Sequence, residues 1–389
     1  MFSATDVGLE LVKSKIKTLT EFLDVYLKIA NVHTVDFYTE DVWNEFVALP
    51  PEAVTSHLLH QQEGSPGADR TGASVWDQTQ KLSDVAAYRR VTQDHALPNL
   101  GVCTPLDDLR QEMWGDKQKD MFLKTSTFMS SKKSHEVEVM SEVIACIAKY
   151  CNIQQDSMMV GLHTCGDLAS DTLRIFMAKP ELKAVCSVGC CYHLLSEEFE
   201  LSDDSKDCCH GPWGFPMSQY LRSSVWHCGR NARMSACLPL ERVTVGNGLP
   251  SESLFYRAVL QVIIKEHYGN GKTYTTLQRT NSKHVGKIYS KSSSFVDYTR
   301  KSVEKLGMDG SKMSDSLIQG YYDRYMPRMK ELEAFNLLKV ALAPCIEGLI
   351  LLDRLCYLKE QENVAWSALV QLFDPLKSPR CYAVIGVKK

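Results

Sequence analysis

The segments Met158 to His163 (MMVGLH) and Ala184 to Cys190 (AVCSVGC) decide the fold of this chain. Each is a short apolar run of the kind that forms a buried strand. A helical pattern from Leu168 to Met177 lies between them, and the whole unit has about the 30 residues that a βαβ crossover requires. The two strands are therefore predicted to be parallel neighbours, with their carboxyl ends at one edge of a sheet.

Helices and a second pair of strands are predicted on either side of this unit. A C-terminal antiparallel hairpin is predicted from Ala365 to Phe373 and from Cys381 to Val387, joined by a Pro-containing turn. The long apolar series from Leu332 to Leu355 is predicted to be core rather than a cofactor site. Helices are predicted over residues 8–48, from Ser134 as N-cap to Cys151, from Ser251 to about His267, and from Arg328 to Gln361 with a break at Pro344.

The predicted organisation is three consecutive segments. Residues 1–60 form a small helical N-terminal region, and residues 61–128 form a loop-rich linker in which the helical periodicity fades. Residues 129–389 form an α/β domain that contains the strands and the hairpin. No internal repeat interrupts this order.

Composition limits the class of protein. The chain has 389 residues, 44 % of them hydrophobic and 23 % charged, so it can bury a core without disulfides and is not disordered throughout. Its net charge of -3 excludes binding to nucleic acid or lipid by bulk positive charge. No export signal or membrane span is visible, and the 14 cysteines are irregularly spaced. An intracellular protein of the cytoplasm or nucleus, with reduced thiols, is predicted.

Polar and sulfur-bearing residues follow both strands of the βαβ unit. The first strand leads into Leu162-His163-Thr164-Cys165-Gly166-Asp167, and the second leads into Gly189-Cys190-Cys191-Tyr192-His193. Ligands collect at the carboxyl ends of parallel strands. On the sequence alone, His163 and His193 could equally act in catalysis or simply form local hydrogen bonds. One shared crevice is predicted to contain His163, Cys165, Asp167, Cys190, Cys191 and His193.

A zinc site is a weaker interpretation of the same region. Six cysteines lie between Cys186 and Cys228, together with three histidines, His193, His210 and His227. Adjacent cysteines on an extended strand point to opposite faces, so Cys190-Cys191 and Cys208-Cys209 do not have the usual spacing of zinc ligands. Buried, reduced cysteines are therefore favoured, and no metal is predicted.

Several segments resemble the methyltransferase-like protein 25 family of S-adenosylmethionine-dependent methyltransferases. They are Val160 to Leu168 (VGLHTCGDL), Val188 to His193 (VGCCYH), Asn231 to Cys237 (NARMSAC), Val285 to Phe295 (VGKIYSKSSSF) and Cys381 to Val387. The resemblance implies a Rossmann-like class I methyltransferase fold with S-adenosylmethionine as cofactor. A similar pairing of His-x-Cys-Gly with Cys-Cys-x-His occurs in a family of tRNA 2'-O-methyltransferases, which suggests RNA as a substrate class.

The resemblance also implies roles for the residues of the predicted crevice. Leu162, His163 and Cys165 would border the cofactor. His163 or His193 would be the base, and Asp167 would orient or cap the loop. Cys190 and Cys191 would shape the acceptor pocket, or act covalently as thiolates.

One part of the family pattern is missing from this sequence. Such domains begin with a strand, a Gly-x-Gly turn and a helix, which together hold the cofactor. Here the helix ending near Cys151 is separated by only a few residues, with a junction at 153–158, from a strand that resembles the fourth of the fold. Two βαβ steps, about 60 residues, are absent there, as a skipped exon would produce. Gly246-Asn247-Gly248 and Gly269-Asn270-Gly271 do not follow strands. A truncated fold with weak or absent cofactor binding is predicted.

Two other functions remain open. The first alternative is a noncatalytic protein that binds RNA or a protein partner, and the second is a cysteine-rich zinc module. A basic tract with interleaved aromatic residues could bind an RNA backbone, although a solvated helix face is the simpler interpretation. The tract comprises Arg279, Lys283, His284, Lys287, Lys291, Arg300 and Lys301, with Tyr289, Phe295 and Tyr298.

Overall fold

A computed structural model describes residues 6–59, 74–114, 129–151, 153, 157–199, 212–245, 251–268 and 288–389. The chain forms two compact units, each assembled from separate stretches of sequence. Unit 1 comprises Met1–Asn31, Val91–Val245 and Val340–Lys389, and unit 2 comprises Val32–Arg90 and Gly246–Lys339. The two strands of the predicted βαβ unit and the C-terminal hairpin all belong to unit 1.

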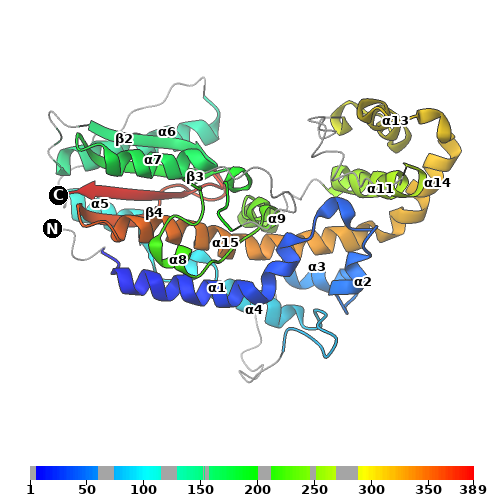
Figure 1. Cartoon of the computed structure of the whole chain (residues 1–389), viewed down its shortest axis with the longest axis horizontal. Helices are drawn as coiled ribbons and strands as arrows, with labels where there is room; N and C mark the ends of the chain where they lie inside the picture. The colour runs from blue at the N-terminus through cyan, green and yellow to red at the C-terminus, as the bar shows by residue number, and fades with distance from the viewer. Residues whose placement is uncertain are drawn as a thin grey trace. The chain divides into compact units, whose positions relative to one another are not determined.

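Unit 1 is built on a mixed sheet (Figure 1) with the strand order β1-β4-β5-β3-β2. Its strands are β1 (Cys103–Pro105), β2 (Ser157–Cys165), β3 (Leu182–Cys190), β4 (Val364–Gln371) and β5 (Tyr382–Lys388). The prediction that β2 and β3 are parallel neighbours is confirmed, with Cys165 opposite Cys190. The hairpin is also confirmed, because β4 and β5 are antiparallel neighbours. Strand β5 pairs antiparallel with β3 as well, which joins the hairpin to the βαβ unit.

Strand β2 forms one edge of this sheet. Its residues are mostly exposed or half-buried, whereas β3 is buried along nearly its whole length. In a doubly wound fold with the order 3-2-1-4-5-6, the fourth strand lies between the first and the fifth. If β2 and β3 are the fourth and fifth strands, no strand among the described residues occupies the place of the first. The sheet therefore agrees with a Rossmann-like fold that lacks its first strands.

Helices cover the faces of the sheet. Helix α7 (Asp167–Ala178) is the predicted crossover between β2 and β3, and α6 (Ser131–Tyr150) precedes β2. The N-cap of α6 is Ser130 rather than the expected Ser134, because the Ser130 hydroxyl accepts a hydrogen bond from the Lys133 amide at 3.4 Å. The remaining helices wholly within unit 1 are α1 (Leu9–Asn31), α5 (Leu106–Trp114), α8 (Gln219–Ser223), α9 (Arg230–Ser235) and α10 (Leu240–Thr244), with short 3-10 helices η2 (Leu97–Asn99) and η4 (Tyr192–Leu194).

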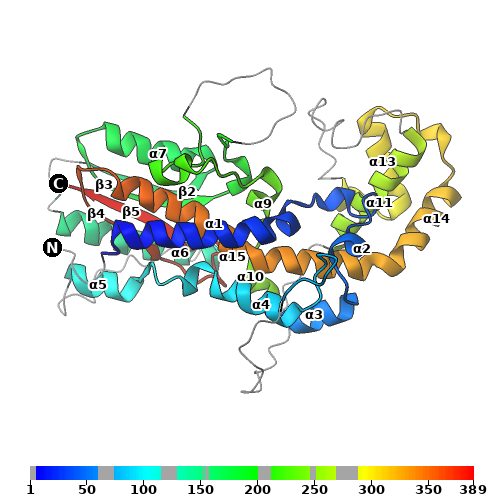
Figure 2. The ribbon, with the colours of Figure 1, turned by 60° about the horizontal axis from the view of Figure 1, so that its bottom comes forward.

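Helix α15 (Met329–Lys359) is continuous, so the predicted break at Pro344 is wrong. Proline removes one backbone donor, but the neighbouring side chains of Leu342 and Ile346 are completely buried and hold both halves of the helix in the core. In Figure 2, the part of α15 in unit 1 runs beside α1, where Leu19 faces Gly348. By length and composition, the helical run Asp315–Lys359 could cross a membrane, but 89 % of its apolar window is buried within the protein, as in a core helix.

Most described elements of unit 2 are helices, and its interior is rich in aromatic side chains. The ring of Tyr256 lies 5.1 Å from that of Phe295 and 5.4 Å from that of Tyr298, measured between ring centroids. These contacts join two of the helices into one core. The helices are α2 (Val42–Phe46), α3 (Pro51–Leu59), α11 (Ser251–Tyr268), α13 (Phe295–Leu306) and α14 (Asp315–Tyr325), with 3-10 helices η1 (Thr34–Asp36), η5 (Tyr289–Lys291), η6 (Gly310–Lys312) and η7 (Met326–Arg328).

The segment expected to be a loop-rich linker contains regular structure. Residues 74–114 include α4 (Val85–Asp94), β1 and α5. Thr104 pairs with Val370 of β4, so this stretch contributes a strand to the sheet of unit 1. The weak periodicity of the sequence missed it because β1 is only 3 residues long. The rest of the expected linker, residues 61–73 and 115–128, lies outside the described residues.

Candidate functional site

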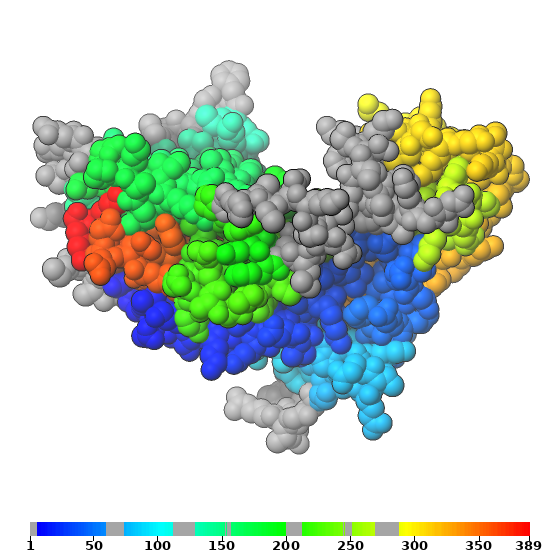
Figure 3. Space-filling model, in the orientation of Figure 1, coloured from blue at the N-terminus to red at the C-terminus, as the bar shows by residue number. Residues whose placement is uncertain are grey.

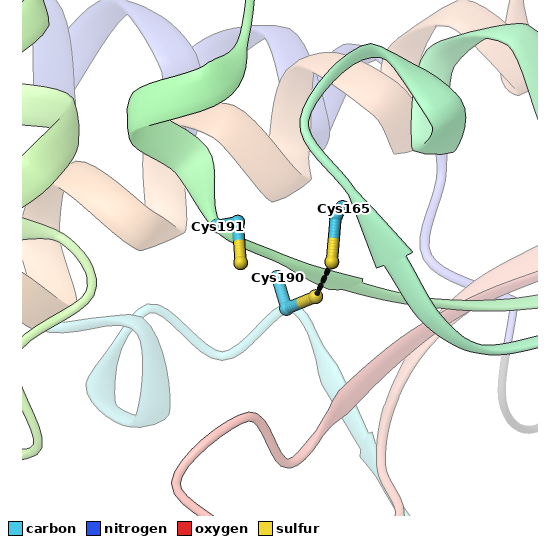
Figure 4. A group of neighbouring side chains, drawn as sticks. All are labelled: Cys165, Cys190 and Cys191. Atoms are coloured by element: carbon cyan, nitrogen blue, oxygen red, sulfur yellow. Dashed lines mark hydrogen bonds between the residues drawn. The ribbon is translucent and has the colours of Figure 1, made fainter.

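Three cysteines meet where β2 and β3 end (Figure 4). Cys165 and Cys190 are the last residues of the two strands, and their sulfur atoms are 3.0 Å apart. Cys191 follows β3, and all three Sγ atoms lie within 4.8 Å of one another. Cys165 is exposed, Cys190 is buried and Cys191 is half-buried. Burial raises the pKa of the Cys190 and Cys191 thiols, so both are protonated at neutral pH when nothing else is bound.

A histidine and a fourth cysteine lie beside this cluster. His193 belongs to the short helix η4, which begins directly after Cys191. Its Nδ1 is 3.7 Å from Sγ of Cys237. Burial lowers the pKa of His193, and the positive charges of Arg230 and Arg233 lower it further. The imidazole is therefore neutral at pH 7, a state in which one ring nitrogen can accept a proton or bind a metal.

His163 is held by a different partner from the cysteines. The pairing of β2 with β3 is irregular between Gly161 and Thr164, so Leu162 and His163 fall in a bulge of the edge strand. Nε2 of His163 lies 3.6 Å from a carboxylate oxygen of Glu136 on α6, and the histidine side chain is 49 % exposed. No hydrogen bond or ion pair within the described part of the chain joins His163 to the cysteine cluster.

Asp167 also turns away from the cysteines. It begins α7, and its Oδ1 accepts a hydrogen bond of 2.7 Å from the backbone amide of Ser196. Before it, Gly166 has φ +53°, and its amide donates to the carbonyl oxygen of Cys190 at 3.1 Å. A Cβ on Gly166 would lie 2.7 Å from the carbonyl oxygen of Leu194. Asp167 and Gly166 therefore fix the loop after β2 against the segment after β3.

Tyr192 anchors the segment from Cys190 to His193 at the end of β3. Tyr192 is completely buried, and its hydroxyl donates to Oε1 of Glu347 at 2.8 Å. Arg380 donates to the same oxygen at 2.9 Å. The guanidinium groups of Arg354 and Arg380 each lie 5.8 Å from the Tyr192 ring centroid. The end of β3 is thereby tied to α15 and to the connection between β4 and β5.

Arg354 brings a buried positive charge to the end of β3. It is 2 % exposed, and its Nη1 fills the space next to Gly189 where any side chain would clash. Within the described residues, its Nε and Nη2 have no hydrogen-bond partner. Burial lowers the pKa of Arg354, while Tyr192, Asp353 and Cys190 raise it. A buried guanidinium with unpaired donors favours negative charge on its neighbours.

Helix α9 is held by Glu197. This carboxylate is buried, forms an ion pair with Arg233, and accepts hydrogen bonds from the amides of Cys228 and Gly229. Arg233 is 2 % exposed and therefore serves this buried pair rather than an anionic substrate. In Figure 3, the green surface around α8 and α9 borders the blue α1, where Asn31 donates to the carbonyl oxygen of Cys228. These contacts place Cys237, which follows α9, beside His193.

Several residues of the site were not found by sequence reasoning. Glu347 and Arg354 are charged residues inside the apolar series of α15, and a charge in such a series is a signal that could have found them. Cys237 lies in the quoted NARMSAC segment but received no role. No local sequence pattern marks Glu136 or Arg380 as part of the site. Cys208, Cys209, His210 and both Gly-x-Gly segments (246–248 and 269–271) lie outside the described residues.

Comparisons with known proteins identify the family. A family model described as "Methyltransferase domain" matches residues 108–198. The mouse protein named "Probable methyltransferase-like protein 25" is 38 % identical over an alignment of 584 positions that covers 96 % of this chain and 96 % of the mouse protein. The human protein of the same name is 36 % identical over 599 positions, covering 98 % of each chain. No solved structure matches the chain significantly.

These alignments are much longer than the chain itself. The alignment with the mouse protein has 584 positions and the chain has 389 residues, so at least 195 positions of the mouse protein stand opposite gaps in this chain. The relatives therefore contain sequence that this chain lacks. Because the similarity extends over 96 % of its residues, the chain belongs to the methyltransferase-like protein 25 family.

Proposed function

We propose that this chain carries the acceptor side of a methyltransferase site and does not bind S-adenosylmethionine by itself. The observation that carries the proposal is the position of β2 at the edge of the sheet. In this fold the cofactor is held by the first strand, its glycine-rich turn and the acidic end of the second strand. The described sheet contains no strand in those positions, and the sequence has no Gly-x-Gly turn that follows a strand. The residues present do not fit the cofactor.

The acceptor side of the site contains side chains that could act on a methyl acceptor. The neutral imidazole of His193 can take a proton from an acceptor that carries one. The half-buried Cys191 precedes His193 by two residues, and its Sγ lies within 4.8 Å of that of the exposed Cys165. The loop that bears Cys165 is fixed by Asp167, which acts by positioning it. RNA is the substrate class that the motif resemblance favours. The intracellular location remains an expectation from the sequence.

Titration with S-adenosylmethionine tests this proposal. We expect isothermal titration calorimetry of the full chain to show no binding at roughly 100 µM cofactor, because a site without its first strands loses most of the contacts to the ribose and the methionine. The mouse relative, measured in parallel, provides the comparison. Binding by this chain at micromolar affinity would show that other residues replace the missing strands, and would overturn the proposal.

A chimaera makes the same test sharper. The additional segment of the mouse relative is inserted at the predicted junction, residues 153–158, and cofactor binding is measured again. Binding gained by the chimaera supports the assignment of the missing strands to this junction. A chimaera that melts cooperatively but binds no better than the parent chain would contradict it.

A noncatalytic RNA-binding protein is the second candidate. A surface depression in unit 2 supports it, because three lysines line it, two from the basic tract and a third, Lys305, one turn further along α13. They are Lys291, Lys301 and Lys305, with Ile288 and Glu304. The aromatic side chains Phe295 and Tyr298 are buried in the core of unit 2, so base stacking would have to come from other residues. Arg279, Lys283, His284 and Lys287 lie outside the described residues.

The salt dependence of RNA binding tests this second candidate. We expect fluorescence anisotropy with a labelled single-stranded RNA to give a slope of log Kobs against log salt that becomes shallower by about 1.4 in the double variant Lys291→Gln/Lys305→Gln, because each lysine contributes about 0.7 on a single strand. Lys312→Gln, an exposed lysine of the same unit outside the depression, should leave the slope unchanged. Equal binding by the double variant and the parent would exclude this surface as the RNA site.

A further inference from the structure

The three cysteines at the ends of β2 and β3 have the arrangement of metal ligands (Figure 4). We propose that Cys165, Cys190 and Cys191 bind a thiophilic divalent metal ion of the zinc type. The proposal goes beyond methyl transfer and does not depend on whether the chain binds S-adenosylmethionine. Sulfur ligands select zinc-like ions over magnesium and calcium, which prefer oxygen.

The distances between the sulfur atoms support this assignment. Thiolates around a tetrahedral zinc ion, with Zn–S bonds of about 2.3 Å, lie about 3.8 Å from one another. Cys165 and Cys190 are 3.0 Å apart, and no pair in the cluster exceeds 4.8 Å. Shifts of less than about 1 Å, within the range of side-chain rotations, bring all three to the required spacing.

The backbone at Cys191 removes the objection that adjacent cysteines cannot share an ion. That objection assumes an extended strand, in which neighbouring side chains point to opposite faces. Strand β3 ends at Cys190, and Cys191 adopts the left-handed conformation with φ 50° and ψ 49°. A residue with a β-carbon rarely adopts this conformation. Here it brings the Sγ atoms of both cysteines to Cys165.

Buried positive charge offsets the charge that metal binding would create. Binding converts the three thiols to thiolates and releases their protons to solvent, so a divalent ion and its three ligands carry a net charge of -1. Arg354 lies behind Gly189 and interacts electrostatically with Cys190, and its Nε and Nη2 lack partners within the part of the chain that the structure describes. A tri-thiolate site would offset the positive charge of Arg354, which is otherwise only partly paired.

The fourth position of the ion would be open. Three protein ligands and one exchangeable position are typical of catalytic zinc, whereas structural zinc has four protein ligands. Cys237 is not part of the group in which every sulfur lies within 4.8 Å, so it is not counted as a ligand. Its Sγ lies 3.7 Å from Nδ1 of His193 instead.

Cobalt titration of the reduced full-length chain tests the proposal. We expect one equivalent of Co²⁺ to produce the thiolate-to-cobalt charge-transfer absorption and tetrahedral d–d bands, and Zn²⁺ to displace it. Cys165→Ser should weaken binding by more than about 100-fold, because it removes one of three ligands. Cys165 is exposed, so this variant should retain the melting temperature of the parent. Cys151→Ser, a half-buried cysteine at the end of α6, is the matched control and should bind like the parent.

Two results would overturn the proposal. The first is a reduced chain that gives no charge-transfer absorption with Co²⁺. The second is binding that persists undiminished in Cys165→Ser and is lost instead when Cys208 and Cys209 are replaced by serine, which would assign the ion to other cysteines. Cys237→Ser should keep the one-to-one stoichiometry, because the three ligands remain. A loss of binding in that variant would contradict the open fourth position.

Discussion

Replacing Glu197 with alanine should destabilise the protein by about 3–5 kcal/mol. The carboxylate is buried and pairs with Arg233, which is 2 % exposed. Its removal leaves the buried guanidinium of Arg233 without the carboxylate with which it forms this ion pair. It also leaves the amides of Cys228 and Gly229 without the acceptor that they use in the native state. Each unsatisfied donor adds to the penalty, so the loss is larger than that of the ion pair alone.

Urea denaturation monitored by circular dichroism measures this effect, and the next residue provides the control. Glu198 forms a two-bonded ion pair with Arg222, at 2.7 Å for each bond, but the arginine side chain is 45 % exposed. Glu198→Ala should therefore cost less than about 1 kcal/mol. Equal shifts of the unfolding midpoint in the two variants would mean that burial does not set the energy of these pairs.

Replacing Gly166 with alanine should cost roughly 2–5 kcal/mol. Two costs add at this position. The residue has φ +53° and ψ −130°, a region that is nearly restricted to glycine. The new methyl group would lie 2.7 Å from both Cβ and the carbonyl oxygen of Leu194, and a backbone oxygen cannot rotate away. The loop after β2 must move, and Cys165 moves with it.

Gly320→Ala is the matched control for this substitution. Gly320 is exposed within α14, and no heavy atom lies within 4 Å of the position that its Cβ would take. Because alanine favours the helix, this variant should be more stable than the parent by about 1 kcal/mol. Thermal melts of the two variants should therefore shift in opposite directions. A Gly166→Ala protein with an unchanged melt would show that the loop after β2 is not constrained by Leu194.

The parts of the fold that could be predicted are those with a strong local pattern. β2, α7 and β3 follow one another without interruption, and their apolar runs specify a parallel pair. β1 was missed because 3 residues carry no periodicity. The continuity of α15 through Pro344 was missed because local preference favours a break there, and only burial of its neighbours overrides that preference.

The candidate site was likewise predicted only in the part that follows from local sequence patterns. The cluster of Cys165, Cys190 and Cys191 follows from two parallel strands that end together. His163 does not join it, because a bulge in β2 redirects the side chain toward Glu136. Arg354 and Arg380 come from segments far along the chain. Their approach to the cysteines depends on tertiary packing, which local sequence patterns do not reveal.

The two edge strands of the sheet, β1 and β2, differ in how readily they could pair with a strand of another polypeptide. β1 has 3 residues, too few to guide the pairing of another chain. β2 has 9 residues (SMMVGLHTC), with no proline, lysine or acidic side chain to repel a neighbour. No strand among the described residues pairs with its outer side, so the part of β2 before the bulge at Gly161–Thr164 is a template for β-sheet extension by a second polypeptide. An edge strand of this length and composition favours association between copies of the chain, so the tendency to self-associate should rise with protein concentration.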